Sequence, residues 1–314
     1  MKCFKSKYPF FIKTKLMKAG VRMEIKVIQA HSSHVNKVKY HPNERLLVSA
    51  GFNGELYLWD VDSGKKLMEF KGHNQTVNCV IWLEKGKKLL SASGSGTILV
   101  HEISSSEPVQ NLQDLKSGVS HMHLTCDSRY LLTSNKKSML RIREWPDGDL
   151  IHKLKSDQQN SGVLATADRS LHAVVGGVGS RLRRYFIPSG EVLEEFEGHE
   201  TAVMGFKFFD NDHYGVSAGY NGSLVIWDMT KHQKLETYHL GGEGYYSISL
   251  SPDEKEAAIA MPYQLIRLRL QDLKSQKLIL PAKGNYSVDY LFDGRQLAIA
   301  SADKNIRLIS IEGS

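Results

Sequence analysis

The stretch HSSHVNKVKYHPNERLLVSAGFNGELYLWD (31–60) decides the fold, because a second stretch, HETAVMGFKFFDNDHYGVSAGYNGSLVIWD (199–228), matches it without a gap. The two stretches start 168 residues apart, which is four times 42. Steps of 42 residues divide most of the chain into seven units in which apolar positions recur, and such a period is the signature of a repeat fold. The approximate units are 31–72, 73–114, 115–156, 157–198, 199–240, 241–280, and 281–314 together with 24–30.

Each unit has the pattern of four short strands. In the first unit these are VNKVKY (35–40), LLVSAG (46–51), ELYLWD (55–60) and KLMEFK (66–71). Asn53-Gly54 supplies a tight turn between the second and the third of them. A small sheet with apolar residues on both faces must be covered on both faces, and radial stacking of the units achieves this. We therefore predict an all-β chain folded as a seven-bladed β-propeller.

The ends of the units carry the residues of a known repeat. The dipeptide Gly-His occurs at 72–73 and 198–199, and Trp-Asp occurs at 59–60 and 227–228. In these features the chain resembles the WD40 repeat family over residues 24–314. The resemblance implies that a His, a Ser, an Asp and a Trp form a hydrogen-bonded tetrad in each blade. The matching residues are His31, Ser49, Asn53 and Trp59 in the first unit, His73 and Ser91 in the second, and His199, Ser217, Asn221 and Trp227 in the fifth.

None of these units carries the full tetrad, because Asn53 and Asn221 stand at the Asp position. Asp303 supplies the acid in the last unit but lacks the His and the Trp. We expect apolar packing between blades to hold the fold where the tetrads are incomplete.

The two ends of the repeat region are expected to close the ring. EIKVIQAH (24–31) aligns with the outer strand KLMEFKGH (66–73) at the same offset of 42, and the chain ends directly after an inner strand. We therefore predict that residues 24–29 complete the last blade by antiparallel pairing of the N- and C-terminal strands.

The net charge of +7 belongs to the start of the chain. Residues 1–22 contain seven Lys or Arg and no Asp or Glu, so residues 23–314 are electrically balanced. We expect 1–22 to be a basic extension without regular structure, and 23–314 to be the propeller; Met23 is a second candidate start. Contact with RNA or an acidic membrane surface is expected only through this extension. A mitochondrial presequence would be richer in Arg and Ser.

An enzyme is the less favoured reading. His31, His73 and His199 occupy structural positions, and the pair His121 and His123 lacks a third metal ligand nearby. The glycine-rich stretch 176–179 is followed by a strand rather than a helix, so it reads as a hairpin. We expect no catalytic residues, no cofactor and no metal. A site in the central channel stays open as an alternative, and it would require polar groups with perturbed pKa values to converge there.

Cysteine usage points to a reducing compartment. The chain has three cysteines and no CxxC pair, so neither zinc nor disulfides are indicated. We expect a cytoplasmic location, with the nucleus as the alternative, and no obligate homo-oligomer.

The resemblance also implies a binding surface, here called the loop face: the end of the ring with the turns between second and third strands and the loops that precede the innermost strands. Large residues are expected there in the fifth, sixth, seventh and first units, which are neighbours around the ring. They are Phe52, Met204, Tyr220, Tyr246 and Tyr286. Clustered aromatic residues are typical of protein-binding hot spots. We hypothesise a scaffold subunit that binds a protein or peptide partner; the alternative is that these rings only cap the channel.

Arg184 stands at an apolar position between blades. We expect either a local slip of its strand or a buried guanidinium paired with Asp157 or Asp168.

Overall fold

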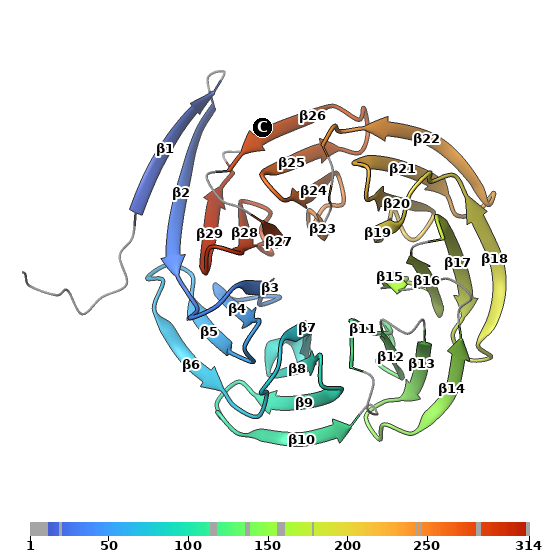
Figure 1. The fold of residues 1–314 in the computed structure, drawn as a ribbon, viewed down its shortest axis with the longest axis horizontal. Coiled ribbons are helices and arrows are strands. Elements are labelled where there is room, and N and C mark those ends of the chain that lie inside the picture. The colour runs from blue at the N-terminus through green and yellow to red at the C-terminus, as the bar shows by residue number, and fades with distance from the viewer. Residues whose placement is uncertain are drawn as a thin grey trace, which may run out of the picture.

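Six blades are sheets of four antiparallel strands in chain order from innermost to outermost, and the seventh has five strands. The seven blades surround a central channel in the computed structural model (Figure 1). The structure describes residues 12–18, 21–113, 118–135, 139–155, 161–177, 179–242, 244, 247–280 and 284–311. The predicted all-β fold and the number of blades are confirmed. One 3-10 turn, η1 (Glu84–Gly86), is the only helical element within the described ranges.

The strands follow the 42-residue period. Blade 1 is β3 (Val35–Tyr40), β4 (Leu46–Gly51), β5 (Leu56–Asp60) and β6 (Lys66–Phe70); blade 2 is β7 (Val77–Leu83), β8 (Lys88–Ser93), β9 (Thr97–Glu102) and β10 (Pro108–Gln113); blade 3 is β11 (His121–Leu124), β12 (Tyr130–Ser134), β13 (Met139–Glu144) and β14 (Leu150–Lys155); blade 4 is β15 (Ser161–Thr166), β16 (His172–Gly177), β17 (Arg181–Phe186) and β18 (Glu191–Glu197).

The remaining three blades continue the same order. Blade 5 is β19 (Val203–Phe209), β20 (Tyr214–Gly219), β21 (Ser223–Asp228) and β22 (Gln233–His239); blade 6 is β23 (Ser247–Leu250), β24 (Glu256–Met261), β25 (Gln264–Arg269) and β26 (Ser275–Ile279); blade 7 is β27 (Asn285–Tyr290), β28 (Gln296–Ser301) and β29 (Asn305–Ser310), with β2 (Val21–Gln29) and β1 (Ile12–Lys18).

The ring closes as predicted. β2 pairs antiparallel with β29, with Ile25 opposite Ile309 and Ile28 opposite Ile306. Ile25 and Ile28 are almost fully buried, at 2% and 1% exposure. The outer strand of the last blade therefore comes from the N-terminal part of the chain, and the hydrophobic effect as well as the ladder holds it in place.

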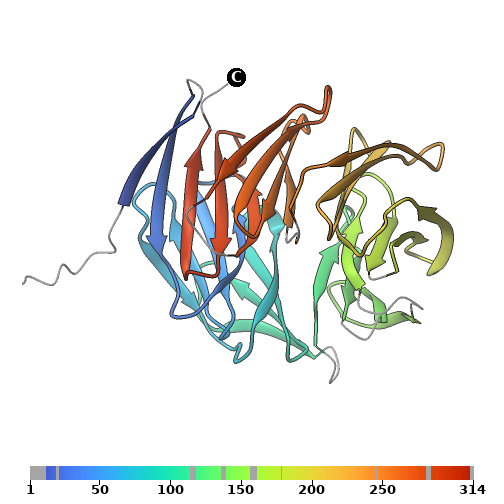
Figure 2. The ribbon, with the colours of Figure 1, turned by 45° about the horizontal axis from the view of Figure 1, so that its top comes forward.

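A fifth strand in blade 7 differs from our expectation for residues 1–22. Residues 12–18 form β1, which pairs antiparallel with β2 and lies outside it at the rim of the ring (Figure 2). The physical reason is that β2 presents an unpaired outer edge, which the extended stretch IKTKLMK satisfies with backbone hydrogen bonds. Residues 1–11, 19 and 20 lie outside the described part of the chain.

The core lies between neighbouring blades rather than inside any one of them. Between blades 4 and 5, Trp227 packs with Phe196, Leu182 and Phe206, and its side chain is 1% exposed. Comparable clusters fill the other interfaces, such as that of Trp59 between blades 7 and 1. Both faces of a typical blade are thus apolar, which is why its strands have buried residues in consecutive positions.

Two tetrad-like networks are present, in blades 5 and 1. In blade 5, Trp227 Nε1 donates to Ser217 Oγ at 2.7 Å, and Ser217 Oγ lies 2.6 Å from His199 Nε2. His199 Nδ1 then contacts Ser223 Oγ at 3.3 Å, which donates to Asn221 Oδ1 at 2.7 Å. Asn221 thus reaches the histidine through an intervening serine.

Blade 1 does have an acidic residue in its network. It is Glu55, two residues after position 53, where the resemblance implies an Asp. His31 Nε2 lies 2.6 Å from Ser49 Oγ, to which Trp59 Nε1 donates at 2.7 Å. His31 Nδ1 donates to Glu55 Oε2 at 2.9 Å, while Asn53 Nδ2 donates to Ser32 Oγ. Glu55 therefore takes the role that the alignment reserved for position 53, because its longer side chain reaches back across the turn.

Blades 2 and 7 keep fragments of the network. His73 Nε2 lies 2.8 Å from Ser91 Oγ, but its buried Nδ1 has no hydrogen-bond partner. In blade 7, Asp303 forms an ion pair with the buried Arg307, and Arg307 Nη1 donates to Ser301 Oγ at 3.1 Å. Arginine from the third strand thus substitutes for histidine there.

The buried histidines predict that acid destabilises the protein. Burial lowers the pKa of His31, His73 and His199 to about 4, from 6.5 for an unperturbed imidazole. Between pH 6.5 and 4 the unfolded state binds more protons, so stability falls as the pH falls through this window. Urea unfolding should show a loss of about 1–2 kcal/mol per histidine between pH 7.5 and 5. His199→Gln should flatten the profile, and a profile parallel to that of the wild type would contradict this account.

Arg184 is largely buried, with 12% of its side chain exposed, and it is paired, although not with the partners we expected. Its Nη2 donates to Glu194 Oε1 at 2.6 Å, directly across the β17–β18 ladder, and its Nη1 donates to Met229 O at 3.0 Å. Asp168 is not its partner, and Asp157 lies outside the described residues. β17 remains the third strand of its blade, so the alternative expectation, a local slip of this strand, is wrong.

Candidate functional site

Three rings meet on the loop face where blades 7 and 1 adjoin. Phe52 lies in the β4–β5 turn, His34 directly precedes β3, and Tyr286 lies near the start of β27. The ring centroids are 5.2 Å apart for His34 and Phe52, 5.4 Å for Phe52 and Tyr286, and 6.1 Å for His34 and Tyr286. We call these three residues the aromatic cluster.

The backbone fixes the aromatic cluster. Phe52 N–H donates to His34 O at 3.0 Å, which ties the turn to the preceding loop, and Thr76 Oγ1 donates to Phe52 O at 2.7 Å from blade 2. The Phe52 side chain is still 37% exposed. A rigid turn that holds an exposed aromatic ring is suited to docking, because little conformational entropy is left to lose on binding.

Two further tyrosines occupy the same kind of turn in neighbouring blades. Tyr220, in the β20–β21 turn, is 50% exposed, and Tyr263, in the β24–β25 turn, is 64% exposed. Met204 is half-buried and packs against the apolar cluster of blades 5 and 6, so it offers less surface than we expected. Tyr246 lies outside the described residues.

Sequence reasoning missed His34 and Tyr263. His34 directly precedes the first strand of its unit, and Tyr263 lies in the turn between the second and the third strand of its unit. Aromatic side chains anywhere in these loops and turns are the signal that identifies both.

The side chains beside the channel on the loop face from blade 1 to blade 3 are polar by contrast, and two of their amide groups are already engaged. Asn36 Nδ2 donates to Val77 O at 2.9 Å, and Asn78 Nδ2 donates to Val119 O at 2.7 Å. Each asparagine thus bridges its blade to the next one around the channel. These side chains join blades and contribute little free hydrogen-bonding capacity to a partner.

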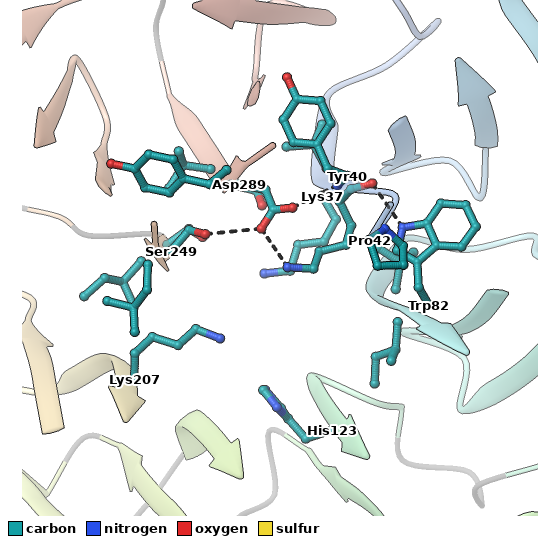
Figure 3. Close-up of a pocket in the computed structure, with 18 of the residues that line it drawn as sticks. Lys37, Tyr40, Pro42, Trp82, His123, Lys207, Ser249 and Asp289 are labelled. Carbon is teal, nitrogen blue, oxygen red and sulfur yellow. Dashed lines mark hydrogen bonds and ion pairs between the residues drawn. The ribbon is translucent and has the colours of Figure 1, made fainter. Parts of the chain in front are cut away.

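The central channel contains the other candidate site, a cavity of about 800 Å³ lined by the innermost strands. Lys37, Lys207, His123 and Asp289 point into it (Figure 3). Burial lowers the pKa of Lys207 to about 8, with a further contribution from Lys39. Polar groups with shifted pKa values therefore do converge here.

The channel histidines come from one strand, as predicted. Both His121 and His123 line the cavity from β11, and burial lowers the pKa of His121 to about 4. Across the described ranges, no three His, Cys, Asp or Glu side chains lie close enough to hold a metal ion. The same part of the chain has no helix of the length and apolarity needed to cross a membrane.

Comparison with known proteins identifies the repeats. Residues 22–60, 64–102 and 190–228 match the family model of the WD domain, G-beta repeat. The WD40 β-propeller domain of Doa1 superimposes with a TM-score of 0.81 and 18% identity, covering 91% of this chain and 96% of that one. This likeness concerns the fold.

Curated relatives are distant. Pre-mRNA-processing factor 19 of Oryza sativa subsp. japonica is 20% identical, over 87% of this chain and 54% of its own length. Pre-mRNA-processing factor 17 of Mus musculus is 24% identical over 88% and 40%, and WD repeat-containing protein 41 of Homo sapiens is 25% identical over 65% and 47%. The chain thus spans about half the length, or less, of these relatives.

Proposed function

We propose that this WD40-repeat β-propeller is a non-enzymatic protein-interaction scaffold and that a partner protein docks on the aromatic cluster of its loop face. The observation that carries the proposal is the contact between His34, Phe52 and Tyr286, three rings from two blades held together at the surface. Aromatic side chains on a rigid support are the usual anchors of protein interfaces. The exposed Tyr220 and Tyr263 extend the surface towards blades 6 and 5.

The expected partner is a segment with an apolar anchor. Phe52 and the ring of Tyr286 offer apolar area, whereas the tyrosine hydroxyl and the imidazole of His34 offer hydrogen bonds at its edge. A partner side chain that covers the cluster would displace water from both rings and gain the hydrophobic term. The polar half of the loop face, at blades 2 and 3, then forms the rim.

For the compartment, we infer a nuclear location. Two of them are named as pre-mRNA-processing factors, which favours a nuclear assembly over the cytoplasmic location expected from the sequence. Fluorescence imaging of the tagged full-length chain tests this directly, and exclusion from the nucleus would contradict it.

Truncation of the aromatic cluster should remove the partner. Phe52→Ala and Tyr286→Ala should each weaken binding by about 1–3 kcal/mol, and the double variant should lose most partners in affinity purification followed by mass spectrometry. The affinity of each variant for a captured partner is then measured by calorimetry.

Phe292→Ala is the matched control. Phe292 is 40% exposed, close to the value for Phe52, but it follows β27 and so lies at the opposite end of the same blade as Tyr286. All variants are first shown to be folded by circular dichroism. Loss of the same partners in Phe292→Ala, or retention of all of them in the double variant, would refute docking at the cluster.

A further inference from the structure

The strand repeat places one residue per blade at the same level of the channel wall. The residue of this level in blade 1 is Lys39, and the period identifies its equivalents in the other innermost strands. They are Ile81, His123, Ala165, Lys207, Ser249 and Asp289, all of which except Ala165 line the cavity. The level thus contains two lysines and one carboxylate, contributed by three different blades.

Both oxygens of the Asp289 carboxylate accept hydrogen bonds from neighbouring residues. Asp289 Oδ1 accepts from Lys39 Nζ at 2.7 Å and from Ser249 Oγ at 3.2 Å, and Asp289 Oδ2 accepts from the Tyr40 N–H at 2.8 Å (Figure 3). Its side chain is only 6% exposed. Asp289 therefore neutralises Lys39 through a direct ion pair, whereas it acts on Lys37 and Lys207 only through space.

Two lysines remain without a partner. Within the described residues, the side-chain ammonium group of neither Lys37 nor Lys207 has a hydrogen bond or an ion pair. They approach from different blades, 1 and 5, and Figure 3 shows both side chains directed into the open channel. Burial lowers the pKa of each, which reports the cost of holding an unpaired cation away from water. Asp168 and Asp289 partly offset the charge of Lys207, and Asp289 partly offsets that of Lys37, without an ion pair to either lysine.

The rest of the wall supplies neutral donors. The imidazoles of His121 and His123 are kept neutral by burial, and Ser247 lines the same cavity. A volume of about 800 Å³ is typical of a site for a small molecule. Donors that surround the cavity suit a ligand with oxygens on all sides, whereas a peptide carboxylate presents two oxygens in one direction.

We propose that the channel binds a compact, multiply charged phosphate anion between Lys37 and Lys207. The anion adds negative charge beside the two lysines, and charge-assisted hydrogen bonds form within the channel. The site lies between the innermost strands and is separate from the aromatic cluster, so it stands or falls independently of the proposed scaffold role.

Calorimetric titration with inorganic pyrophosphate, at an ionic strength matched with sodium chloride, tests the proposal. The full chain should bind, and Lys207→Met and Lys37→Met should each weaken binding at least about tenfold. The matched control is Lys153→Met, which removes the same charge from the exposed outer strand β14 and should leave affinity unchanged. Inorganic phosphate, with a single phosphorus centre, should bind more weakly than pyrophosphate.

A thermal-shift measurement keeps the test decisive if affinity is low. Without ligand, Lys207→Met should melt above the wild type, because a desolvated cation is gone; with pyrophosphate, only the wild type and Lys153→Met should rise. Lys207→Gln serves if the methionine variant does not fold. No response beyond that to chloride, an equal response in all variants, or binding of a hexaglutamate peptide in place of pyrophosphate would overturn the proposal.

Discussion

Replacing Trp227 with alanine should lower the free energy of unfolding by about 3–5 kcal/mol. The indole is 1% exposed and packs edge-on against Phe196, with ring centroids 5.6 Å apart. Its loss opens a cavity between blades 4 and 5, where the surrounding strands cannot collapse without disturbing two sheets. It also removes the N–H that Ser217 accepts at 2.7 Å and so weakens the network of His199.

Urea unfolding followed by circular dichroism measures this effect. Trp82→Ala is the matched control, because Trp82 is only half-buried at the channel wall, and it should cost less than half as much. Trp59, which is 4% exposed and has the same bond to a serine, should behave like Trp227. A neutral Trp227 substitution would mean that the indole does not fill the interface between the blades.

Removing β2 should be at least as damaging. Deletion of residues 1–30 exposes the edge of β29 and takes away Ile25 and Ile28, so we expect a loss of about 3–6 kcal/mol from the burial of the two isoleucines alone. Deletion of residues 1–20 removes β1 but leaves the closing ladder intact, and it should cost under about 1 kcal/mol.

Differential scanning calorimetry of the two truncations decides between these outcomes. The pair is internally controlled, because both lack β1 and differ only in residues 21–30. Equal melting temperatures would show that closure by β2 contributes nothing to stability. A large loss in the shorter deletion would instead make β1 part of the closing element.

Periodicity explains why so much of the architecture could be predicted. A residue buried between blades recurs every 42 positions, so one clear unit such as 31–60 sets the alignment of the degraded ones, and ring closure follows from EIKVIQAH matching an outer strand. The same logic reaches the channel, where Lys39, Lys207 and Asp289 share one repeat position.

What could not be predicted depends on side-chain reach. Glu55 replaces the missing acid because a longer side chain bridges back to His31, and nothing in the alignment of position 53 indicates this. Arg184 pairs with Glu194 because the two residues lie opposite each other in the ladder. This pairing can be predicted only when the register of β17 and β18 is known. β1 could not be predicted because residues 12–18 lie outside the repeat, and the strand forms by pairing with the outer edge of β2.

The closing pair β2–β29 has a consequence for biosynthesis. Its two strands are separated by almost the whole chain, so at ribosomal speed β2 leaves the exit tunnel roughly 15–60 s before β29 exists. During that wait a lone strand with two bare edges invites misassembly with other nascent chains. β1 is the neighbour of β2 in sequence, and a local hairpin forms within microseconds, so one edge is already occupied while the other waits. Although deletion of β1 is expected to cost the finished ring little, β1 thus covers one edge of β2 while the ring is still incomplete.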